Sequence, residues 1–325
     1  MRVVVLGAGY GTRLEADLVA EGSDSERTLL LGLPKALLPV GGCPLAMRWC
    51  SQLSRPPAAA AADGSSASPY AHVWVVHNDL HAEAYRSWAN ESGFPPSHLI
   101  NDGTTENASR LGALRDLVLA VDAADAAEAA TAAAGSGKER GRADPEGGQH
   151  ESHAARWSRP LLVVAGDTLF RPDFDLADFL TLGLDAIGRG QADAVLTYYT
   201  LASDAEVSRR GVVELGARPD AAGLAPVRGF LEKPDPTATA SRSACPPLYL
   251  YSPRAVALLR RYLSEHAGQL SLCDAPGVWI PWLLRHGGHA ASAARIWAYG
   301  PLSGRFDIGS LQDYRVADAF FRSDS

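Results

Sequence analysis

Two of the three lysines in this chain lie in short motifs suited to holding phosphate. The chain has 30 basic residues, and among them only Lys35, Lys138 and Lys233 are lysine. A lysine ammonium is a compact point charge that suits phosphate, whereas arginine is a planar fork of donors. Lys35 lies between two prolines, and Lys233 directly follows Glu232. These positions predict two phosphate contacts, whereas Lys138, in a Gly/Glu/Arg-rich segment, is expected to be solvated.

A glycine-rich loop near the N-terminus is a further candidate for anion binding. It reads Leu6-Gly7-Ala8-Gly9-Tyr10-Gly11-Thr12-Arg13-Leu14 and follows a short apolar run. Glycines let backbone N–H groups turn toward a phosphate where a loop leads into a helix. The spacing does not fit the dinucleotide-binding fingerprint, and the Gly-Lys-Ser/Thr of a Walker A motif is absent from the sequence. A dehydrogenase with a Rossmann dinucleotide site is therefore disfavoured.

Composition and charge argue against several classes of function. The net charge is −7 at pH 7 and the basic residues form no block, which argues against a nucleic-acid-binding groove. The four cysteines have no Cys-x-x-Cys spacing and no histidines at zinc spacing, so we expect free thiols in a reducing, cytoplasmic compartment. No run approaches the roughly 18 apolar residues of a membrane helix. Neither nucleic acid nor a membrane is an expected partner.

Apolar segments of two kinds alternate along most of the chain. Runs at residues 3–6, 73–77, 99–100, 161–165 and 194–199 predict buried strands. A helical stripe is formed by Leu111, Leu114, Leu117, Val118 and Val121, with Thr104 or Thr105 available as its N-cap. This alternation predicts an α/β fold with a doubly wound, Rossmann-like and mostly parallel sheet that carries helices on both faces.

Shorter strands in the C-terminal half predict a small β-rich acceptor or lid region. They are expected at residues 211–215, 228–232 and 247–251. Two low-complexity segments, 56–69 and 123–158, resemble insertions because they have few large apolar side chains to offset their ordering entropy. The Ala-rich start of the second can extend the preceding helix, and we expect its remainder to be mobile. The prediction is a single domain over residues 1–325.

Six motifs occur in an order that is typical of one enzyme family. The first joins Gly11-Thr12-Arg13-Leu14 to Pro34-Lys35-Ala36-Leu37-Leu38-Pro39-Val40-Gly41-Gly42, and the others are Gly166-Asp167-Thr168, Arg210-Gly211-Val212-Val213-Glu214, Phe230-Leu231-Glu232-Lys233-Pro234, Leu248-Tyr249-Leu250-Tyr251 and Arg305-Phe306-Asp307-Ile308-Gly309-Ser310. Together they resemble the sugar-1-phosphate nucleotidyltransferases, or nucleoside-diphosphate-sugar pyrophosphorylases, and especially the catalytic domain of glucose-1-phosphate thymidylyltransferases. The resemblance spans residues 1–317.

This resemblance implies a reaction and a set of site residues. A nucleoside triphosphate and a sugar-1-phosphate would give a nucleoside-diphosphate sugar and pyrophosphate, with Mg²⁺ as cofactor. The sugar phosphate would attack the α-phosphorus in line, and it needs no protein base because it is already anionic. The implied catalytic residues are Arg13 and Lys35; the nucleotide-binding residues are Leu6, Gly7, Ala8, Gly9, Gly11, Thr12, Arg13, Asn107 and Gly112; the sugar-phosphate-binding residues are Gly211, Glu232 and Lys233; and the Mg²⁺ ligands are Asp167 and Asp307.

Some segments depart from the family pattern. The usual Ala-Ala-Gly is Gly7-Ala8-Gly9 here, and the segment from Leu14 to Pro34 is long and is expected to be a loop. The base-reading segment, residues 101–113, differs from the usual Leu-Gly-Thr-Ala-Gly-Ala or Asp-Gly-Leu-Ala-Gln. We expect no further domain after residue 317 and therefore a single-domain transferase, with a homo-oligomer as a possible assembly.

Two alternatives keep the fold but change the function. One is a cytidylyltransferase for a phosphorylated alcohol or a phosphonate, and the other is an inactive subunit that binds sugar nucleotides and regulates a partner. Glu232 and Lys233 favour a sugar acceptor, and the retained Arg13 and Lys35 favour catalysis. Single positions also have ordinary structural explanations; Asp307, for example, can be a turn residue. The sequence names neither the base nor the sugar.

Overall fold

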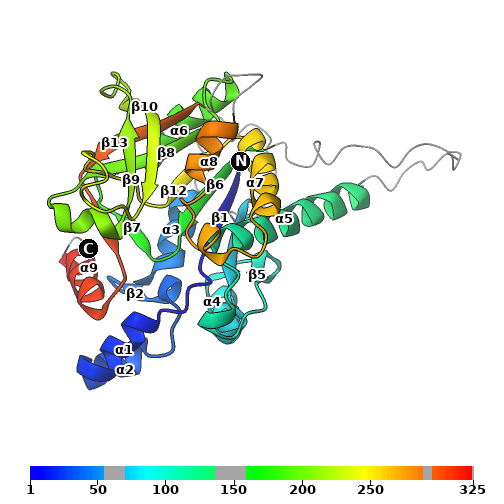
Figure 1. Ribbon diagram of the computed structural model, residues 1–325. Helices are drawn as coiled ribbons and strands as arrows, with labels where there is room; N and C mark the ends of the chain where they lie inside the picture. The colour runs from blue at the N-terminus through cyan, green and yellow to red at the C-terminus, as the bar shows by residue number, and fades with distance from the viewer. Residues whose placement is uncertain (55–69, 136–158, 288–294, 324–325) are drawn as a thin grey trace, which may run out of the picture.

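A ten-stranded mixed sheet forms the centre of the computed structural model, which describes residues 1–54, 70–135, 159–287 and 295–323 (Figure 1). The strand order is β11-β9-β10-β13-β8-β12-β6-β1-β4-β5. The strands are β1 (Arg2–Leu6), β4 (Val73–His77), β5 (Leu99–Asn101), β6 (Leu161–Ala165), β8 (Ala194–Thr200), β9 (Gly211–Leu215), β10 (Leu224–Glu232), β11 (Ser243–Ala244), β12 (Leu248–Tyr251) and β13 (Ile296–Leu302). Two short ribbons accompany the sheet, β2 (Pro39–Val40) with β3 (Cys43–Pro44) and β7 (Thr168–Phe170) with β14 (Arg305–Asp307).

The prediction of a mostly parallel sheet is wrong. The strands run parallel from β6 through β1 and β4 to β5, and again between β8 and β13. The remaining pairings are antiparallel. β12 runs opposite to both β6 and β8, β10 runs opposite to β9 and β13, and β11 runs opposite to β8 and β9. The predicted strands at 73–77, 161–165 and 211–215 are confirmed, whereas the strand expected at 228–232 begins earlier, at Leu224.

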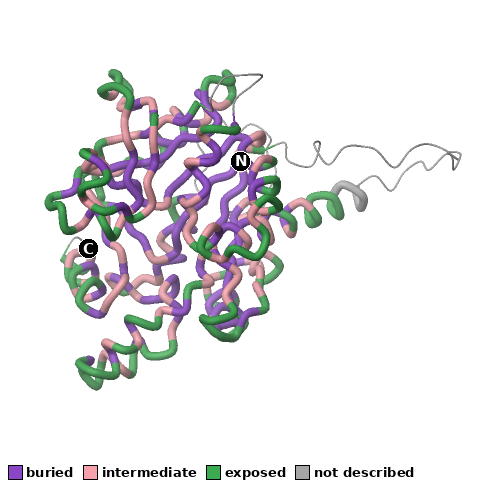
Figure 2. Tube along the Cα trace, in the orientation of Figure 1, coloured by how far each residue is buried: buried purple, intermediate pink, exposed green. Residues whose placement is uncertain are grey.

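Helices cover both faces of the sheet, as predicted. The alternation of a strand sends Val3 and Val5 to one face and Val4 to the other, and each face has its own buried cluster. The first face is covered by α3 (Leu45–Leu53), α4 (Ala82–Ser92) and α6 (Leu176–Gly188), and the second by α5 (Ala113–Gly135), α7 (Pro253–Glu265) and α8 (Ile280–His286). Figure 2 shows the burial of these central strands. The parallel strands therefore end at an edge that rigid packing supports from both sides.

The segment between Leu14 and Pro34 is helical, so the expected loop is wrong. It forms α1 (Thr12–Glu21) and α2 (Asp24–Leu30), which pack with α9 (Leu311–Ser323). Ser23 and Glu26 form a reciprocal capping box that starts α2. Leu14, Leu18 and Leu30 are buried in a third apolar cluster with residues of β14 and α9. This packing ties the glycine-rich loop to the C-terminal part of the chain.

The helical stripe lies on α5 except for Leu111, which precedes the helix, and the predicted N-cap is wrong. The helix begins at Ala113, and Thr104 instead accepts a hydrogen bond from Tyr10 (2.7 Å) and donates one to Asp102 (2.8 Å). The Ala-rich extension is confirmed as far as Gly135. The insertion at 56–69 and the second insertion beyond residue 135 lie outside the described residues. Within the described ranges, no helix is long and apolar enough to span a bilayer.

Candidate active site

The glycine-rich loop joins β1 to α1 at the carboxyl edge of the parallel strands. A Cβ placed at Gly7 would lie 2.9 Å from the Val76 carbonyl oxygen, and the Tyr85 hydroxyl donates a hydrogen bond to the Gly7 carbonyl (3.0 Å). Gly11 has a φ of 66°, a backbone conformation that favours glycine. A Cβ at Gly9 would meet no described atom within 4 Å. The loop is therefore packed against the sheet at Gly7 and open at Gly9, where an anion can approach the backbone.

Lys35 lies directly beside this loop. It begins a 3-10 turn, and its Cγ would be 3.6 Å from a Cβ at Gly11. Its Nζ is 3.4 Å from Oδ2 of Asp167. Gly166 permits this approach, because a Cβ there would lie 2.9 Å from that of Ala36. The structure thus brings together the loop, the lysine and one of the predicted metal ligands, which are far apart in the sequence.

The two predicted metal ligands are close because β7 and β14 pair. Asp307 is opposite Thr168 in this ribbon, and Asp167 directly precedes Thr168. Two guanidinium groups donate to the same oxygen, Oδ2 of Asp307: Nη1 of Arg210 at 2.8 Å and Nη2 of Arg305 at 3.1 Å. Neither arginine was predicted from the sequence to have a role at the site. Both are the first residues of quoted motifs, and their charge beside a predicted site was the signal that could have revealed them.

The electrostatics of this pair suit a divalent cation. Burial raises the pKa of Asp167, the Asp307 carboxylate raises it further, and Lys35 opposes both effects. Each carboxylate uses only its Oδ2 in the described hydrogen bonds, so both Oδ1 atoms remain available. Mg²⁺ prefers one or two carboxylates together with phosphate oxygens and water. Among the described residues no group of three or more metal-binding side chains occurs, so the rest of such a coordination shell would come from ligand and solvent.

Arg13 follows the same loop, in the first turn of α1. Its Nη1 is 3.6 Å from where a Cβ at Gly309 would lie, and Gly309 follows Asp307 by two residues. The guanidinium is exposed, whereas the next residue, Leu14, is buried and anchors α1. Arg13 is therefore held near the carboxylate pair while its donors still face solvent.

Glu232 and Lys233 mark the end of β10, the site expected to bind the sugar phosphate. Oε2 of Glu232 lies between two glycines, 3.3 Å from a Cβ placed at Gly211 and 2.9 Å from one placed at Gly277. Burial raises the pKa of Glu232, and Lys233 opposes this. No hydrogen bond joins its carboxylate to another described side chain, so it can accept from ligand hydroxyls. Lys233 is exposed, and its φ of 48° is a strained conformation for a residue other than glycine.

The predicted nucleotide residues Asn107 and Gly112 are less directly connected to the loop. Gly112 has a φ of 92°, and a Cβ there would lie 2.7 Å from the Cys273 carbonyl oxygen, so packing alone explains the glycine. Asn107 is exposed at the start of a 3-10 turn, and no hydrogen bond of its side chain reaches another described residue. The neighbouring Arg110 is paired with Asp274 at 2.7 and 3.0 Å. Among the hydrogen bonds of the described residues, the one from Tyr10 to Thr104 connects the loop with this segment.

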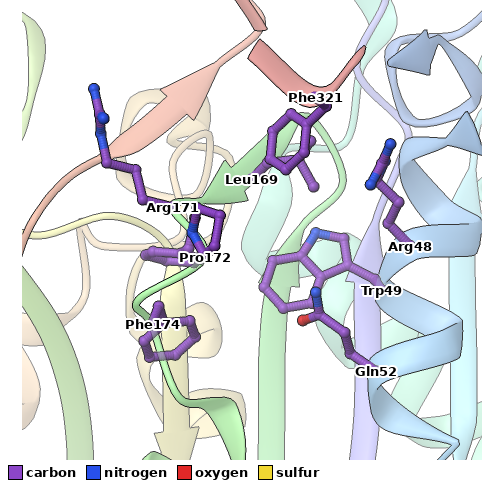
Figure 3. A pocket seen from close by; sticks show the side chains of 9 residues that line it. Arg48, Trp49, Gln52, Leu169, Arg171, Pro172, Phe174 and Phe321 are labelled. Atoms are coloured by element: carbon purple, nitrogen blue, oxygen red, sulfur yellow. The ribbon is translucent and has the colours of Figure 1, made fainter. Parts of the chain in front are cut away.

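An aromatic cavity lies behind β7, away from these residues. Its volume is about 260 Å³, and Figure 3 shows Trp49, Leu169, Phe174 and Phe321 around it. It is lined by none of the residues that the sequence predicted for the site. The Trp49 Nε1 donates to the Thr168 carbonyl (2.8 Å). Trp49, which lines the cavity, therefore helps to hold β7, the strand that follows Asp167, in place.

Comparison with solved structures identifies the fold. No family model matches the chain, and no curated protein matches its sequence. A UDP-glucose pyrophosphorylase complexed with UDP-glucose has 15% identity, covers 100% of this chain and 99% of its own, and gives a TM-score of 0.57. A UDP-glucose pyrophosphorylase from Acinetobacter baumannii has 16% identity, with 98% and 92% covered, at 0.58.

A protein described as a glucose-1-phosphate thymidylyltransferase from Bacillus anthracis, in complex with sucrose, has 16% identity, with 99% and 95% covered, at a TM-score of 0.57. These structural neighbours are sugar-1-phosphate nucleotidyltransferases, which agrees with the resemblance inferred from the six motifs. At such low identity the likeness establishes the fold. The chemistry has to be argued from the residues at the site.

Proposed function

We propose that this chain is a Mg²⁺-dependent nucleotidyltransferase. It would join a nucleoside triphosphate to a sugar-1-phosphate and release pyrophosphate. The observation that carries the proposal is the convergence of Lys35, the glycine-rich loop and the pair Asp167 and Asp307 at one edge of the sheet. Glu232, free to accept hydrogen bonds, supports a polyhydroxylated acceptor beside that edge. Residues 1–325 would act as a single domain.

In this proposal the chain works by positioning and charge neutralisation. Backbone N–H groups from Ala8 to Thr12 hold the triphosphate, whereas the Gly7 N–H donates to the Val76 carbonyl oxygen at 2.9 Å, so the predicted contact through that N–H is wrong. Arg13 holds the leaving β- and γ-phosphates. Lys35 neutralises charge that develops at the α-phosphorus in the transition state. Because the acceptor phosphate is already anionic at neutral pH, the reaction requires no general base. Catalysis of this type depends on fixed donors, which suits a lysine held between the loop and a buried strand end.

The acceptor and the cation fit the remaining residues. Lys233 binds the sugar phosphate, and Glu232 accepts hydrogen bonds from sugar hydroxyls. Asp167 and Asp307 would hold Mg²⁺, which when bound screens the phosphate charges and stabilises those that build up during transfer. The Asp307 carboxylate raises the pKa of Asp167, and each of the two carboxylates has an unused oxygen, so the pair is a suitable set of ligands for such a cation.

A substrate matrix tests this function. Pyrophosphate release is measured with Mg²⁺ while five nucleoside triphosphates are crossed with a panel of sugar-1-phosphates and with phosphocholine. The proposal predicts release that requires one particular triphosphate and one particular sugar-1-phosphate. Release with phosphocholine instead would establish the cytidylyltransferase alternative. No release, with nucleotide still bound in a thermal-shift assay, would contradict catalysis and support the regulatory alternative.

A further inference from the structure

Arg210 lies where the carboxylate pair and the acceptor residues meet. Its Nη1 donates to Asp307 Oδ2 at 2.8 Å, and its backbone carbonyl accepts the N–H of Lys233 at 3.0 Å. The next residue, Gly211, lies against the Glu232 carboxylate. One residue therefore contacts both the predicted metal ligand and the predicted sugar-binding residues. A phosphate that is attached to the sugar and faces the α-phosphorus has to lie between these two groups.

The Arg210 side chain has unused donors. Of the five N–H donors of a guanidinium, the described contacts use one, and its Nε is buried with no hydrogen-bond partner. Its side chain is 27% exposed. A guanidinium with free donors can bind a phosphate through two hydrogen bonds at once. Its single bond to a carboxylate does not use this capacity.

Arg305 also binds Asp307, so Arg210 can leave this carboxylate and bind a ligand. Arg305 is 7% exposed, donates to Asp307 Oδ2 at 3.1 Å and is also held by the Thr168 hydroxyl at 3.0 Å. Removing one of two cations from a carboxylate does not leave the charge unpaired, whereas removing a sole partner would. Asp307 therefore keeps Arg305 when Arg210 moves. The buried arginine is the fixed partner, and the more exposed one is available to a ligand.

We propose that Arg210 binds the phosphate of the acceptor by turning from Asp307 to a phosphate monoester. This inference rests on the proposed function. It extends that function because it names Arg210 as a residue that binds the acceptor class, a phosphate monoester. Lys233 supplies a compact charge to that phosphate and Arg210 supplies a fork. The hydrogen bond from the Lys233 N–H to the Arg210 carbonyl holds the backbones of the two residues together, and it helps to hold Lys233 at its positive φ.

Binding without turnover tests this inference. Glucose 1-phosphate, methyl phosphate and glucose are titrated by calorimetry against the wild type, Arg210→Gln, Arg210→Lys and Arg209→Gln. Arg209 is the adjacent, exposed arginine, so its variant carries the same change of charge. Charge-assisted hydrogen bonds of this kind correspond to roughly a tenfold to hundredfold change in affinity. We expect that loss for Arg210→Gln, a smaller loss for Arg210→Lys and less than about a twofold change for Arg209→Gln.

Each other outcome overturns the inference. Equal affinity in Arg210→Gln and the wild type would show that the guanidinium does not bind the phosphate. An equal loss of affinity for glucose, which has no phosphate, would indicate a distorted acceptor pocket instead. Failure of the wild type to bind either phosphate monoester would remove the site altogether. Arg210→Lys decides the question if Arg210→Gln does not fold. These titrations measure binding and not product. A failure of this inference can therefore be distinguished from a failure of the proposed function, which would show as no pyrophosphate release in the substrate matrix.

Discussion

Replacing Asp116 with asparagine should change how the free energy of unfolding depends on pH. Asp116 lies in the first turn of α5, one turn after Gly112. It is 7% exposed, and its Oδ1 is buried without a hydrogen-bond partner. Burial raises the pKa of Asp116 from its ordinary 3.8 to about 7, and the Asp102 and Asp274 carboxylates contribute to the increase. The folded protein therefore holds this proton near neutral pH, whereas the unfolded chain releases it.

The sign and size of the effect follow from this difference. Below about pH 4 the carboxyl is protonated in both states and contributes nothing to the pH dependence. Between about pH 4 and pH 7 only the unfolded chain releases the proton, so stability falls as pH rises, and above about pH 7 the penalty is constant. At about 1.4 kcal/mol per pKa unit, a rise of about three units corresponds to an upper limit of about 4 kcal/mol.

Urea unfolding followed by tryptophan fluorescence measures this penalty. An asparagine cannot ionise, so Asp116→Asn should gain about 2–3 kcal/mol relative to the wild type between about pH 5 and pH 8. Asp24→Asn, in the exposed first turn of α2, is the matched control for the loss of one carboxylate. Parallel curves for Asp116→Asn and the wild type would refute the reasoning, because they would mean that Asp116 ionises normally in the folded protein.

Three further substitutions probe the site. Lys35→Ala should lower kcat on the order of 10²–10³-fold but weaken triphosphate binding only a few-fold, since its charge acts in the transition state; near-normal turnover in steady-state kinetics would remove Lys35 from catalysis. Gly277→Ala places a Cβ 2.6 Å from the Phe230 ring and 2.9 Å from Glu232 Oε2, so Glu232 has to shift and KM for the acceptor should rise on the order of tenfold or more while KM for the triphosphate stays constant. An unchanged acceptor KM would show that the Glu232 carboxylate is not used. Trp49→Phe removes the donor to the buried Thr168 carbonyl and should cost about 1–3 kcal/mol in urea unfolding, and a loss well below that would mean that the carbonyl finds another donor.

Local features were readable from the sequence because local physics determines them. The run at 161–165 is apolar at every position, as a strand covered by helices on both faces must be, and it is found as β6. The capping box of Ser23 and Glu26 was equally readable, and using it would have predicted α2. The motif order similarly placed Lys35 and Asp167 in one site, and their side chains lie 3.4 Å apart.

Contacts between distant segments were not readable in the same way. Thr104 is a good N-cap residue, yet its hydroxyl is used by Tyr10 and Asp102, and nothing local to Thr104 indicates those partners. The convergence of Arg210 and Arg305 on one oxygen of Asp307 depends on how β14 pairs with β7 and where β9 begins. Such contacts follow from the tertiary fold, which a single sequence does not specify position by position.

An isotope-transfer measurement tests the central claim most directly. The sugar-1-phosphate selected by the substrate matrix is prepared with ¹⁸O at the three non-bridging phosphate oxygens and converted with its triphosphate and Mg²⁺. Attack of the sugar phosphate on the α-phosphorus predicts that mass spectrometry finds all three labels in the nucleoside-diphosphate sugar and none in pyrophosphate. Label in pyrophosphate, or pyrophosphate formed without a nucleoside-diphosphate sugar, would contradict the proposed transfer.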